Sequence, residues 1–449
     1  MHNIDKFRKS NHGISKTISL ATFQELITDA EIQTICRRTG HTWRQRLLPP
    51  PTMIRSMVYR SLHTNKSIKT LLTDIAAMNL ESQAPTDAAW CRARSKLPAE
   101  LWHHLMQLTE SRLSRLVGHK YLYCGLPVFI IDGSTVSMPD EPELAKTFGY
   151  ANTKHGLSRF PVARMTFIVR LGTQAVCAYE MGHYRTSEDA QFNRMWPQLP
   201  SHSICLFDKK FCSFYNLAKL QQRHISIISP LHQKRNPYQL IKGGKSIGKN
   251  QWIVFLQLAP QLRKRYDDNS LPLQLPVRLI HVKFRRNGKP RHLWLVTTLL
   301  DGKKYPRSSI IKLYRQRWKI ETRIGSLKTT LQMDVLRSKT VKNVCSEVAA
   351  AVLAHNLVWT VIHRASQQAG IRSERISFTG AARTVLAFSI CMQTIETSER
   401  HSVYRAMLYH IARQVNPYRP NRIEPRLVKR QTRRYGFLKI PRDKARLIA

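Results

Sequence analysis

Two short apolar segments, each followed directly by an aspartate, set the strongest limits on the fold. Val128–Ile131 precedes Asp132, and Ile204–Phe207 precedes Asp208. Because neither segment contains a polar residue, each is predicted to be a short strand that is buried on both faces and ends at its aspartate. Further candidates follow along the chain: strands at 161–171, 173–184 and 225–229, and helices at 187–196 and 211–224. The expected class is therefore α/β, with a core of mixed strands.

The spacing of apolar residues and the distribution of turn residues divide the chain further. β-type segments at 252–258, 277–284 and 292–300 predict a β-rich insertion within the α/β core. The predicted parts are, in order, a helical N-terminal domain (1–120), the first part of the core (121–230), the β-rich insertion (231–304), the last part of the core with a long helix (305–370), and a C-terminal helical region with a basic tail (371–449).

A large excess of positive charge indicates a polyanionic partner. Lys and Arg total 73 against 28 Asp and Glu, which gives a net charge of +45. Basic side chains that contact phosphates release condensed counterions and so gain affinity. The competing partner is an anionic membrane, but the sequence has no long basic amphipathic helix. A ribosome-like packaging protein would not need a chain that is 42% hydrophobic. We therefore expect nucleic acid as the partner and no membrane, with the cationic tail from Arg419 ordering on nucleic acid.

Two short helices are predicted around 67–80 and 86–97 in the N-terminal region. Their basic residues are Lys66, Lys69, Arg92, Arg94 and Lys96. Such a pair could enter a DNA groove, or it could belong to a helical bundle with a solvated basic face. The sequence leaves both interpretations open.

The cysteines and the apolar stretches bear on location. Eight cysteines are scattered without a Cys-x-x-Cys pair, which argues against a zinc site and favours reduced thiols in a cytosolic protein. The first residues, Met-His-Asn-Ile, contain no apolar targeting segment. Val348–Ile362 is the longest apolar stretch, and it is shorter than a bilayer span, so we expect a buried helix.

A helix predicted over 308–331 places four polar side chains in one row. Tyr314, Arg317, Glu321 and Lys328 fall within about 60° of one another at about 100° per residue. The row lies beside the apolar stripe of the helix rather than opposite it, as expected for side chains at the edge of a packed interface. The simpler alternative is an Arg317–Glu321 pair on a solvated surface, which contributes only a few tenths of a kcal/mol.

The two aspartates suggest a cation site if their strands are parallel neighbours. In that case Asp132 and Asp208 meet, and converging carboxylates repel each other unless a cation joins them. Carboxylate oxygens suit Mg²⁺ or Mn²⁺. For each aspartate alone, a turn residue after its strand is the commoner explanation, above all for Asp132 with its following glycine. We expect Glu321 to lie within one metal site's reach of both.

Together these segments resemble the DDE transposases of the insertion-sequence-4 family of bacterial elements. The pattern Tyr314-x-x-Arg317-x-x-x-Glu321 followed by Lys328 is complete, and the segments around Asp132 and Asp208 are similar to the first and second aspartate motifs. One departure is that Lys209 and Lys210 stand where the family usually has a small residue and an arginine. The resemblance extends from about residue 20 to the basic tail.

The resemblance implies a ribonuclease H-like catalytic core with a β-rich insertion, preceded by a helical domain that binds DNA ends. It implies a metal site of Asp132, Asp208 and Glu321 that holds two divalent ions, Mg²⁺ or Mn²⁺. Tyr314, Arg317 and Lys328 would hold DNA phosphates, and we add Lys209 and Lys210 as DNA-binding cations. The implied partners are the element ends and target DNA, bound by a homodimer, in the bacterial cytoplasm at the nucleoid.

One aromatic residue of the insertion has two interpretations. Some relatives stack a flipped base on a tryptophan of the insertion, and Trp294 lies near the matching place. Packing of Trp294 in the core is an equal alternative, and Trp252 is a weaker candidate for the same role. A shift of one residue in a strand would turn the side chain to the other face.

Two other functions remain open at this point. The first is a catalytically inactive DNA-binding protein derived from a transposase. The second is a ribonuclease H-like nuclease or resolvase, which would cut DNA without joining it. The complete set of carboxylates argues against the first, and the row around Glu321 together with the basic tail argues against the second.

Overall fold

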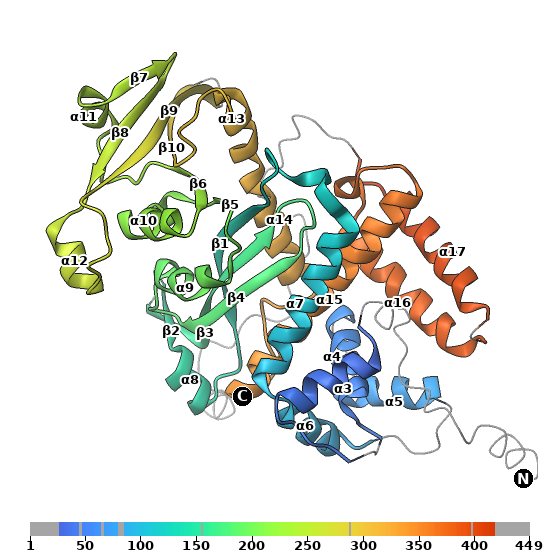
Figure 1. Ribbon diagram of the computed structural model, residues 1–449. Helices are drawn as coiled ribbons and strands as arrows, with labels where there is room; N and C mark the ends of the chain where they lie inside the picture. Colours follow the sequence, from blue (N-terminus) through green and yellow to red (C-terminus); the bar gives the residue numbers. More distant parts are fainter. Residues whose placement is uncertain are drawn as a thin grey trace, which may run out of the picture. The chain divides into compact units, whose positions relative to one another are not determined.

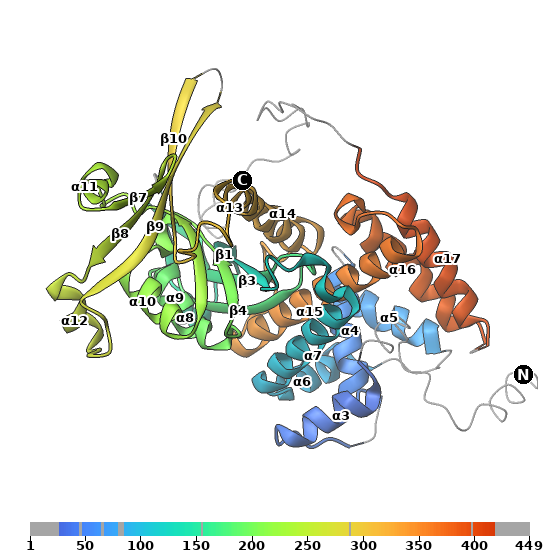
Figure 2. The ribbon, with the colours of Figure 1, turned by 45° about the horizontal axis from the view of Figure 1, so that its top comes forward.

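The structure is a computed structural model that describes residues 27–44, 47–63, 67–79, 85–153, 156–286, 289–396 and 398–417 (Figures 1 and 2). The predicted basic tail from Arg419 and the basic residue Lys66 lie outside the described residues. The described residues up to Val415 form one compact unit, and of the second unit, 416–449, only the first two residues are described.

One large mixed sheet runs through the described part of the chain, as Figure 1 shows. Its hydrogen-bonded order is β2-β3-β1-β5-β6-β10-β9-β8-β7, and β4 pairs with β3 outside this path. The strands are β1 (Val128–Ser137), β2 (Tyr150–Thr153), β3 (Gly156–Arg170), β4 (Val176–His183), β5 (Ser203–Leu206), β6 (Ile225–Pro230), β7 (Lys245–Gly248), β8 (Gln251–Gln257), β9 (Gln274–Arg286) and β10 (Lys289–Thr297). The predicted α/β class with mixed strands is confirmed.

The strands that carry the two aspartates are parallel neighbours. β1 is parallel to β5, and β5 is parallel to β6, whereas β1 and β3 are antiparallel. One prediction was wrong in detail, because β1 does not end at Asp132. It continues to Ser137, since its antiparallel pairing with β3 extends that far, whereas its pairing with β5 stops at Ile130. Asp132 therefore lies within a strand, just beyond the end of the neighbouring β5.

The strands of 231–304 belong to the same sheet as the core. β10 pairs with β6, and β9, β8 and β7 follow in antiparallel order. Their positions agree with the β-type segments expected from the sequence. Together with two short helices they extend the core sheet at one edge instead of building a second sheet (Figure 2).

Helices cover both faces of the core strands. Alternate residues of β1 enter separate hydrophobic clusters, because Val128 and Ile130 join one cluster while Phe129 and Ile131 join the other. This is the two-sided burial that the uniformly apolar segment predicts. The helices are α3 (Asp29–Arg38), α4 (Pro50–Leu62), α5 (Ile68–Asn79), α6 (Asp87–Lys96), α7 (Ala99–Val117), α8 (Pro142–Phe148), α9 (Glu188–Met195), α10 (Phe214–Gln222), α11 (Pro237–Lys242), α12 (Pro260–Tyr266), α13 (Arg307–Arg315), α14 (Lys319–Gly325), α15 (Val341–Gln368), α16 (Phe378–Thr394) and α17 (Arg400–Arg413).

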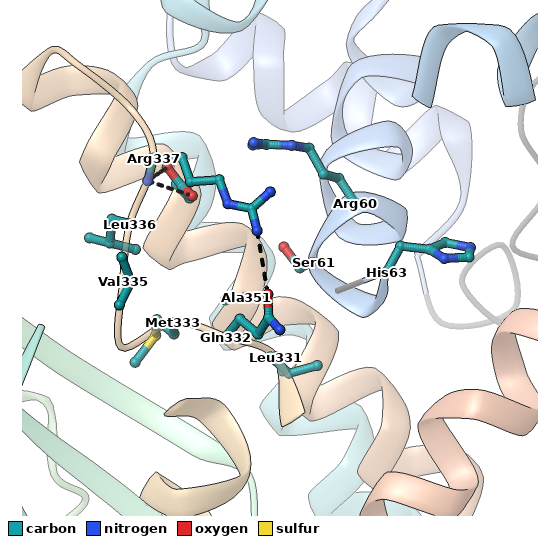
Figure 3. A pocket seen from close by; sticks show the side chains of 11 residues that line it. Arg60, Ser61, His63, Leu331, Gln332, Met333, Val335, Leu336, Arg337 and Ala351 are labelled. Carbon is teal, nitrogen blue, oxygen red and sulfur yellow. Dashed lines mark hydrogen bonds between the residues drawn. The ribbon is translucent and has the colours of Figure 1, made fainter. Parts of the chain in front are cut away.

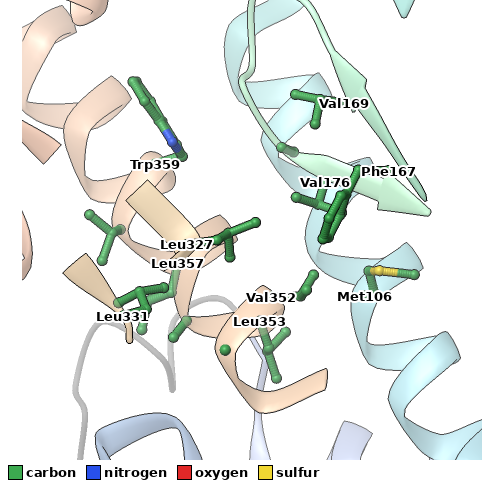
Figure 4. Close-up of a cluster of buried hydrophobic side chains, with 14 of the residues drawn as sticks. Met106, Phe167, Val169, Val176, Leu327, Leu331, Val352, Leu353, Leu357 and Trp359 are labelled. Atoms are coloured by element: carbon green, nitrogen blue, oxygen red, sulfur yellow. The ribbon is translucent and has the colours of Figure 1, made fainter. Parts of the chain in front are cut away.

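Helix α15 forms the centre of the larger cluster. It is long and apolar enough to cross a membrane, yet 89% of its most apolar window is buried inside the protein, as predicted for this stretch. Figure 4 shows its Leu353, Leu357 and Trp359 near Leu327 and Leu331. The last two residues lie at the C-terminal end of the helical segment that carries Glu321. On another side the cluster reaches Phe167 of β3 and Met106 of α7. Figures 1 and 2 both show α7 alongside α15.

The N-terminal helices contact the segment that follows this helical run. Figure 3 shows that segment, 331–337, beside the end of α4, where a cavity of about 50 Å³ remains. The Arg337 backbone N–H donates to Glu347 at 3.2 Å, and Arg94 of α6 donates to Ser338 at 3.2 Å. Arg94 is only 5% exposed, so this basic residue links two parts of the protein and does not belong to a solvated face.

Two buried histidines of α15 predict an acid-sensitive fold. Burial lowers the pKa of His355 to about 3 and that of His363 to about 4. Trp359 donates its indole N–H to His355 Nε2, which requires that nitrogen to be unprotonated. In the unfolded chain both histidines titrate near pH 6.5, so the unfolded state takes up protons first as the pH falls. Stability is therefore fully present above about pH 6.5 and is lost as the pH falls toward about 4.

Urea unfolding at pH 7.5 and 5.0 measures this loss. We expect each histidine to contribute about 2 kcal/mol of it, at about 1.4 kcal/mol per pH unit below pH 6.5. His363→Gln should show a smaller loss between the two pH values than the wild type. The control is His202→Gln, because His202 is exposed. An equal pH dependence in the wild type and in His363→Gln would contradict the prediction.

Candidate catalytic site

The helical run that carries Glu321 changes pitch twice. Its predicted extent, 308–331, is confirmed, but α13 passes into a 3₁₀ turn, η4 (Gln316–Trp318), before α14, and α14 passes into a π-helical turn, η5 (Ser326–Thr330). The row of side chains was predicted for a regular α-helix over 308–331. Residues in a 3₁₀ turn advance about 120° each, and π turns occur frequently at functional sites. Arg317 lies in the first of these turns and Lys328 in the second.

Arg317 brings two of the predicted carboxylates together. Its guanidinium lies 3.3 Å from Asp132 Oδ2 and 3.5 Å from Glu321 Oε1. The Arg317 side chain is only 11% exposed, whereas that of Glu321 is 46% exposed. The predicted Arg317–Glu321 pair therefore exists, but it does not stand alone on the surface. Arg317 also contacts Asp132 of β1.

The third carboxylate lies level with the first. Val128–Ile130 pairs in parallel with Ile204–Leu206, and continuing that register by two residues places Asp208 opposite Asp132. Asp208 begins a 3₁₀ turn, η3 (Lys209–Phe211), and its Oδ1 accepts the Lys209 backbone N–H at 2.7 Å. Asp132 within β1 and Asp208 just after β5 thus lie at equivalent positions along the register of two parallel neighbours.

The charges of this region act on one another. Burial raises the pKa of Asp132, and the nearby Glu188 and Glu321 raise it further, while the Gly133 N–H and Arg317 oppose them. Burial disfavours the Arg317 cation, but Tyr314 and the carboxylates of Asp132 and Asp208 outweigh burial and raise the pKa of Arg317. Burial raises the pKa of the Tyr314 phenol, and the charges of the two aspartates raise it further, whereas Arg317 lowers it. The guanidinium is therefore the cation around which these groups are arranged.

The remaining predicted basic residues surround this centre. Lys328 Nζ donates to the Thr135 backbone oxygen at 3.0 Å, which ties the π turn to the strand of Asp132. Lys209 is exposed at the start of the turn after Asp208. The Lys210 side chain is 64% exposed, and its Nζ lies 3.8 Å from Glu188 Oε2. These lysines place positive charge beside the carboxylates.

Two residues of this region were not predicted from the sequence. Trp318 is 61% exposed in the 3₁₀ turn beside Arg317. Its position within the motif was a usable signal, because a large aromatic next to Arg317 has no place in the predicted apolar stripe. Glu188 acts on Asp132 although it is distant in sequence, and no spacing pattern indicated it.

Trp294 of β10 packs in an aromatic cluster with residues of β8, β9 and α11. Its ring stacks on His281 with centroids 4.1 Å apart, and it lies 5.8 Å from Trp252 and 5.7 Å from Tyr238. The side chain is half-buried. The packing alternative thus describes its present contacts, and stacking on a base remains a prediction.

The donor atoms suit a hard divalent cation. Within the described ranges, no three His, Cys, Asp or Glu side chains lie close enough together to hold a metal ion. The expected convergence on one ion is absent in this arrangement, in which Arg317 bridges Asp132 and Glu321. All three predicted ligands are carboxylates, which Mg²⁺ and Mn²⁺ prefer. In the structure the Arg317 guanidinium supplies the positive charge beside Asp132 and Glu321.

Comparisons with known proteins identify a family and a relative that match most of the described site. The family described as "Transposase DDE domain" matches residues 123–357. The chain is 26% identical over 402 residues to "Transposase InsG for insertion sequence element IS4" of Escherichia coli (strain K12), covering 88% of this chain and 88% of that protein. Among solved structures, a piggyBac transposase synaptic complex with hairpin DNA is 10% identical, with a TM-score of 0.43 over 93% of this chain and 89% of that one.

Proposed function

This chain belongs to the DDE transposases, enzymes that cleave and transfer DNA, and we propose that it binds the terminal inverted repeats of an insertion element and catalyses both steps at Asp132, Asp208 and Glu321. The observation that carries the proposal is the Arg317 bridge, which joins Asp132 to Glu321 beside Asp208. A structural ion pair would not need a third carboxylate level with the first.

The arrangement of the strands supports a ribonuclease H-like core. Three antiparallel strands, β4, β3 and β1, are followed in the sheet by the parallel β5 and β6. The first aspartate is on the central strand, the second follows its parallel neighbour, and the glutamate is on a later helix. This order supports the core that the resemblance implies, with 231–304 as its insertion. For 1–120 we propose the role of the domain that binds DNA ends.

Asp132, Asp208 and Glu321 would hold two divalent ions, Mg²⁺ or Mn²⁺. When bound, these ions supply the activated water and the stabilisation of the leaving oxygen in phosphodiester cleavage. Arg317, released from the carboxylates, is placed to grip a backbone phosphate with its planar donors. Tyr314 and Lys328 would contact phosphates of the same DNA strand, and Lys209 and Lys210 would add positive charge beside the carboxylates.

Two successive reactions at one site account for cleavage and transfer. In the first, the oxygen of water bonds to the phosphorus at the element end, the P–O3′ bond breaks, and the released 3′ oxygen takes a proton. In the second, that 3′-OH attacks a target phosphodiester, and the target's own 3′ oxygen leaves. We infer that the chain acts as a homodimer on paired element ends and that its net charge of +45 holds DNA along the protein.

A labelled element end tests the proposal. The protein is incubated with a duplex that carries the terminal inverted repeat, with Mg²⁺, with Mn²⁺ or with EDTA, and a duplex of shuffled end sequence is the control. We expect nicking at the end and joining to a target plasmid, both dependent on the cation and on the repeat. Binding without cleavage would favour an inactive DNA-binding protein. Cleavage without joining would favour a nuclease or resolvase.

A further inference from the structure

A fourth carboxylate, Glu188, lies beside the predicted three. It is the first residue of α9, whose N-terminus is capped by the Ser187 side chain. The Glu188 side chain is only 14% exposed. Its negative charge and that of Glu321 both raise the pKa of Asp132, in addition to the larger effect of burial. Burial of a charged carboxylate is unfavourable unless other groups pair with it, so the partners of Glu188 are informative.

Glu188 lies directly on the backbone of the strand that carries Asp132. A Cβ atom added to Gly133 would lie 2.3 Å from Glu188 Cδ and 2.6 Å from its Oε1. No side chain could occupy that position without moving Glu188. The glycine after Asp132 therefore serves as the contact surface for this glutamate.

Two cations lie beside the Glu188 carboxylate, one at each oxygen. Arg164 of β3 lies 3.2 Å from Oε1 and is itself fixed by a 2.9 Å hydrogen bond from its Nε to the Tyr184 oxygen. Lys210 lies 3.8 Å from Oε2. The first cation belongs to the sheet, and the second belongs to the turn that begins at Asp208. Glu188 thus touches both segments that carry the aspartates.

The backbone does not join these segments where the aspartates lie. Pairing between β1 and β5 ends at Ile130 and Leu206, two residues before Asp132 and Asp208. Beyond that point the two strands are not paired with each other: β1 continues along β3, and Phe207 donates its backbone N–H to Ile228 of β6. Side chains that reach from one segment to the other therefore help to fix their separation. The chain Gly133–Glu188–Lys210 spans that gap.

We propose that Glu188 is a positioning residue for strand cleavage, which holds Lys210 and thereby fixes the turn of Asp208 relative to the strand of Asp132. This inference rests on the proposed function, since it assigns the aspartates to one reaction. Glu188 acts through Lys210 and need not touch DNA. A misplacement of about 1 Å at an active site can cost up to about 10²-fold in rate.

A double-mutant cycle measures this coupling. Glu188→Gln keeps an oxygen for Arg164 but removes the charge that holds Lys210, and Lys210→Gln removes the other partner. We expect each single variant to nick the element end about tenfold more slowly than wild type. The double variant should be no slower than either single variant, because both remove the same link. The midpoint of the Mg²⁺ dependence should rise severalfold in Glu188→Gln, as expected when the supports of metal ligands are lost.

The matched control is Glu180→Gln. Glu180 lies on β4 and pairs with Arg194 of α9 at 2.9 Å in a more exposed position, so its replacement removes the same charge from another ion pair that involves α9. It should change neither the rate nor the Mg²⁺ midpoint. The thermal unfolding midpoint is recorded for every variant. If Glu188→Gln failed to fold, Lys210→Gln would still test the link, because Lys210 is exposed. Nicking is measured at saturating protein, so that a loss of DNA affinity from this basic residue does not lower the rate.

Two results would overturn the inference. One is a Glu188→Gln variant that behaves like Glu180→Gln. The other is a double variant about a hundredfold slower than wild type, which would mean that the two residues act independently. Both require that the wild type nicks and that Glu321→Gln does not. If the wild type itself failed to nick the element end, the proposed function would fail first.

Discussion

Glu321→Gln is expected to abolish strand cleavage while the protein remains folded and bound to DNA. Glutamine keeps the size of the side chain but loses the negative charge that a divalent cation requires. Metal ions contribute several kcal/mol to stabilising the transition state, and each 1.36 kcal/mol is a factor of ten in rate. We therefore expect nicking of the element end to fall by at least about 10³-fold.

This loss is measured in single-turnover nicking with Mg²⁺ at saturating protein. The control is Glu399→Gln, because Glu399 is exposed and its side chain does not cap α17. A second readout avoids catalysis: Mn²⁺ should raise the thermal unfolding midpoint of the wild type but not that of Glu321→Gln. Retention of more than a tenth of the nicking rate would remove Glu321 from the proposed metal site.

Trp359→Ala is expected to destabilise the whole unit that carries the site. Trp359 is completely buried in α15, and its ring packs 4.3 Å from the Arg323 guanidinium of α14. Its indole N–H also donates to His355. Replacing a buried tryptophan by alanine costs about 3–5 kcal/mol, because packing is lost and a cavity remains.

The same chain offers a matched tryptophan. Trp318 is 61% exposed in the turn beside Arg317, so Trp318→Ala should change the free energy of unfolding by no more than about 0.5 kcal/mol. Urea unfolding of both variants at pH 7.5 separates the two roles. A loss of similar size in both would show that exposure does not distinguish these residues. Trp318→Ala should instead weaken DNA binding, which a filter-binding titration in EDTA would detect.

The sequence predicted the core of this protein better than its details. Uniformly apolar segments identified β1 and β5 correctly, because burial on both faces leaves no room for polar residues. The end of β1 was misjudged, since its pairing with β3 depends on a partner more than twenty residues away. Likewise, apolar spacing located the helical run around Glu321 but could not reveal its two changes of pitch.

The site was predictable only in part for the same reason. Local spacing brought Tyr314, Arg317 and Glu321 together, and the parallel strands aligned the two aspartates. The Arg317–Asp132 contact and the place of Glu188 depend on tertiary packing, to which sequence spacing is blind. Trp294 shows the limit in another way, because its stacking partner His281 comes from a neighbouring strand.

The Arg317 bridge also has a thermodynamic consequence. A guanidinium that neutralises Asp132 and Glu321 competes with any divalent cation for the same oxygens. Once displaced, it becomes available to a phosphate. On the proposed function, cation and DNA would therefore be positive effectors of each other, and linkage requires the coupling to be equal in both directions. Such an enzyme would load its cation most readily after it has engaged an element end.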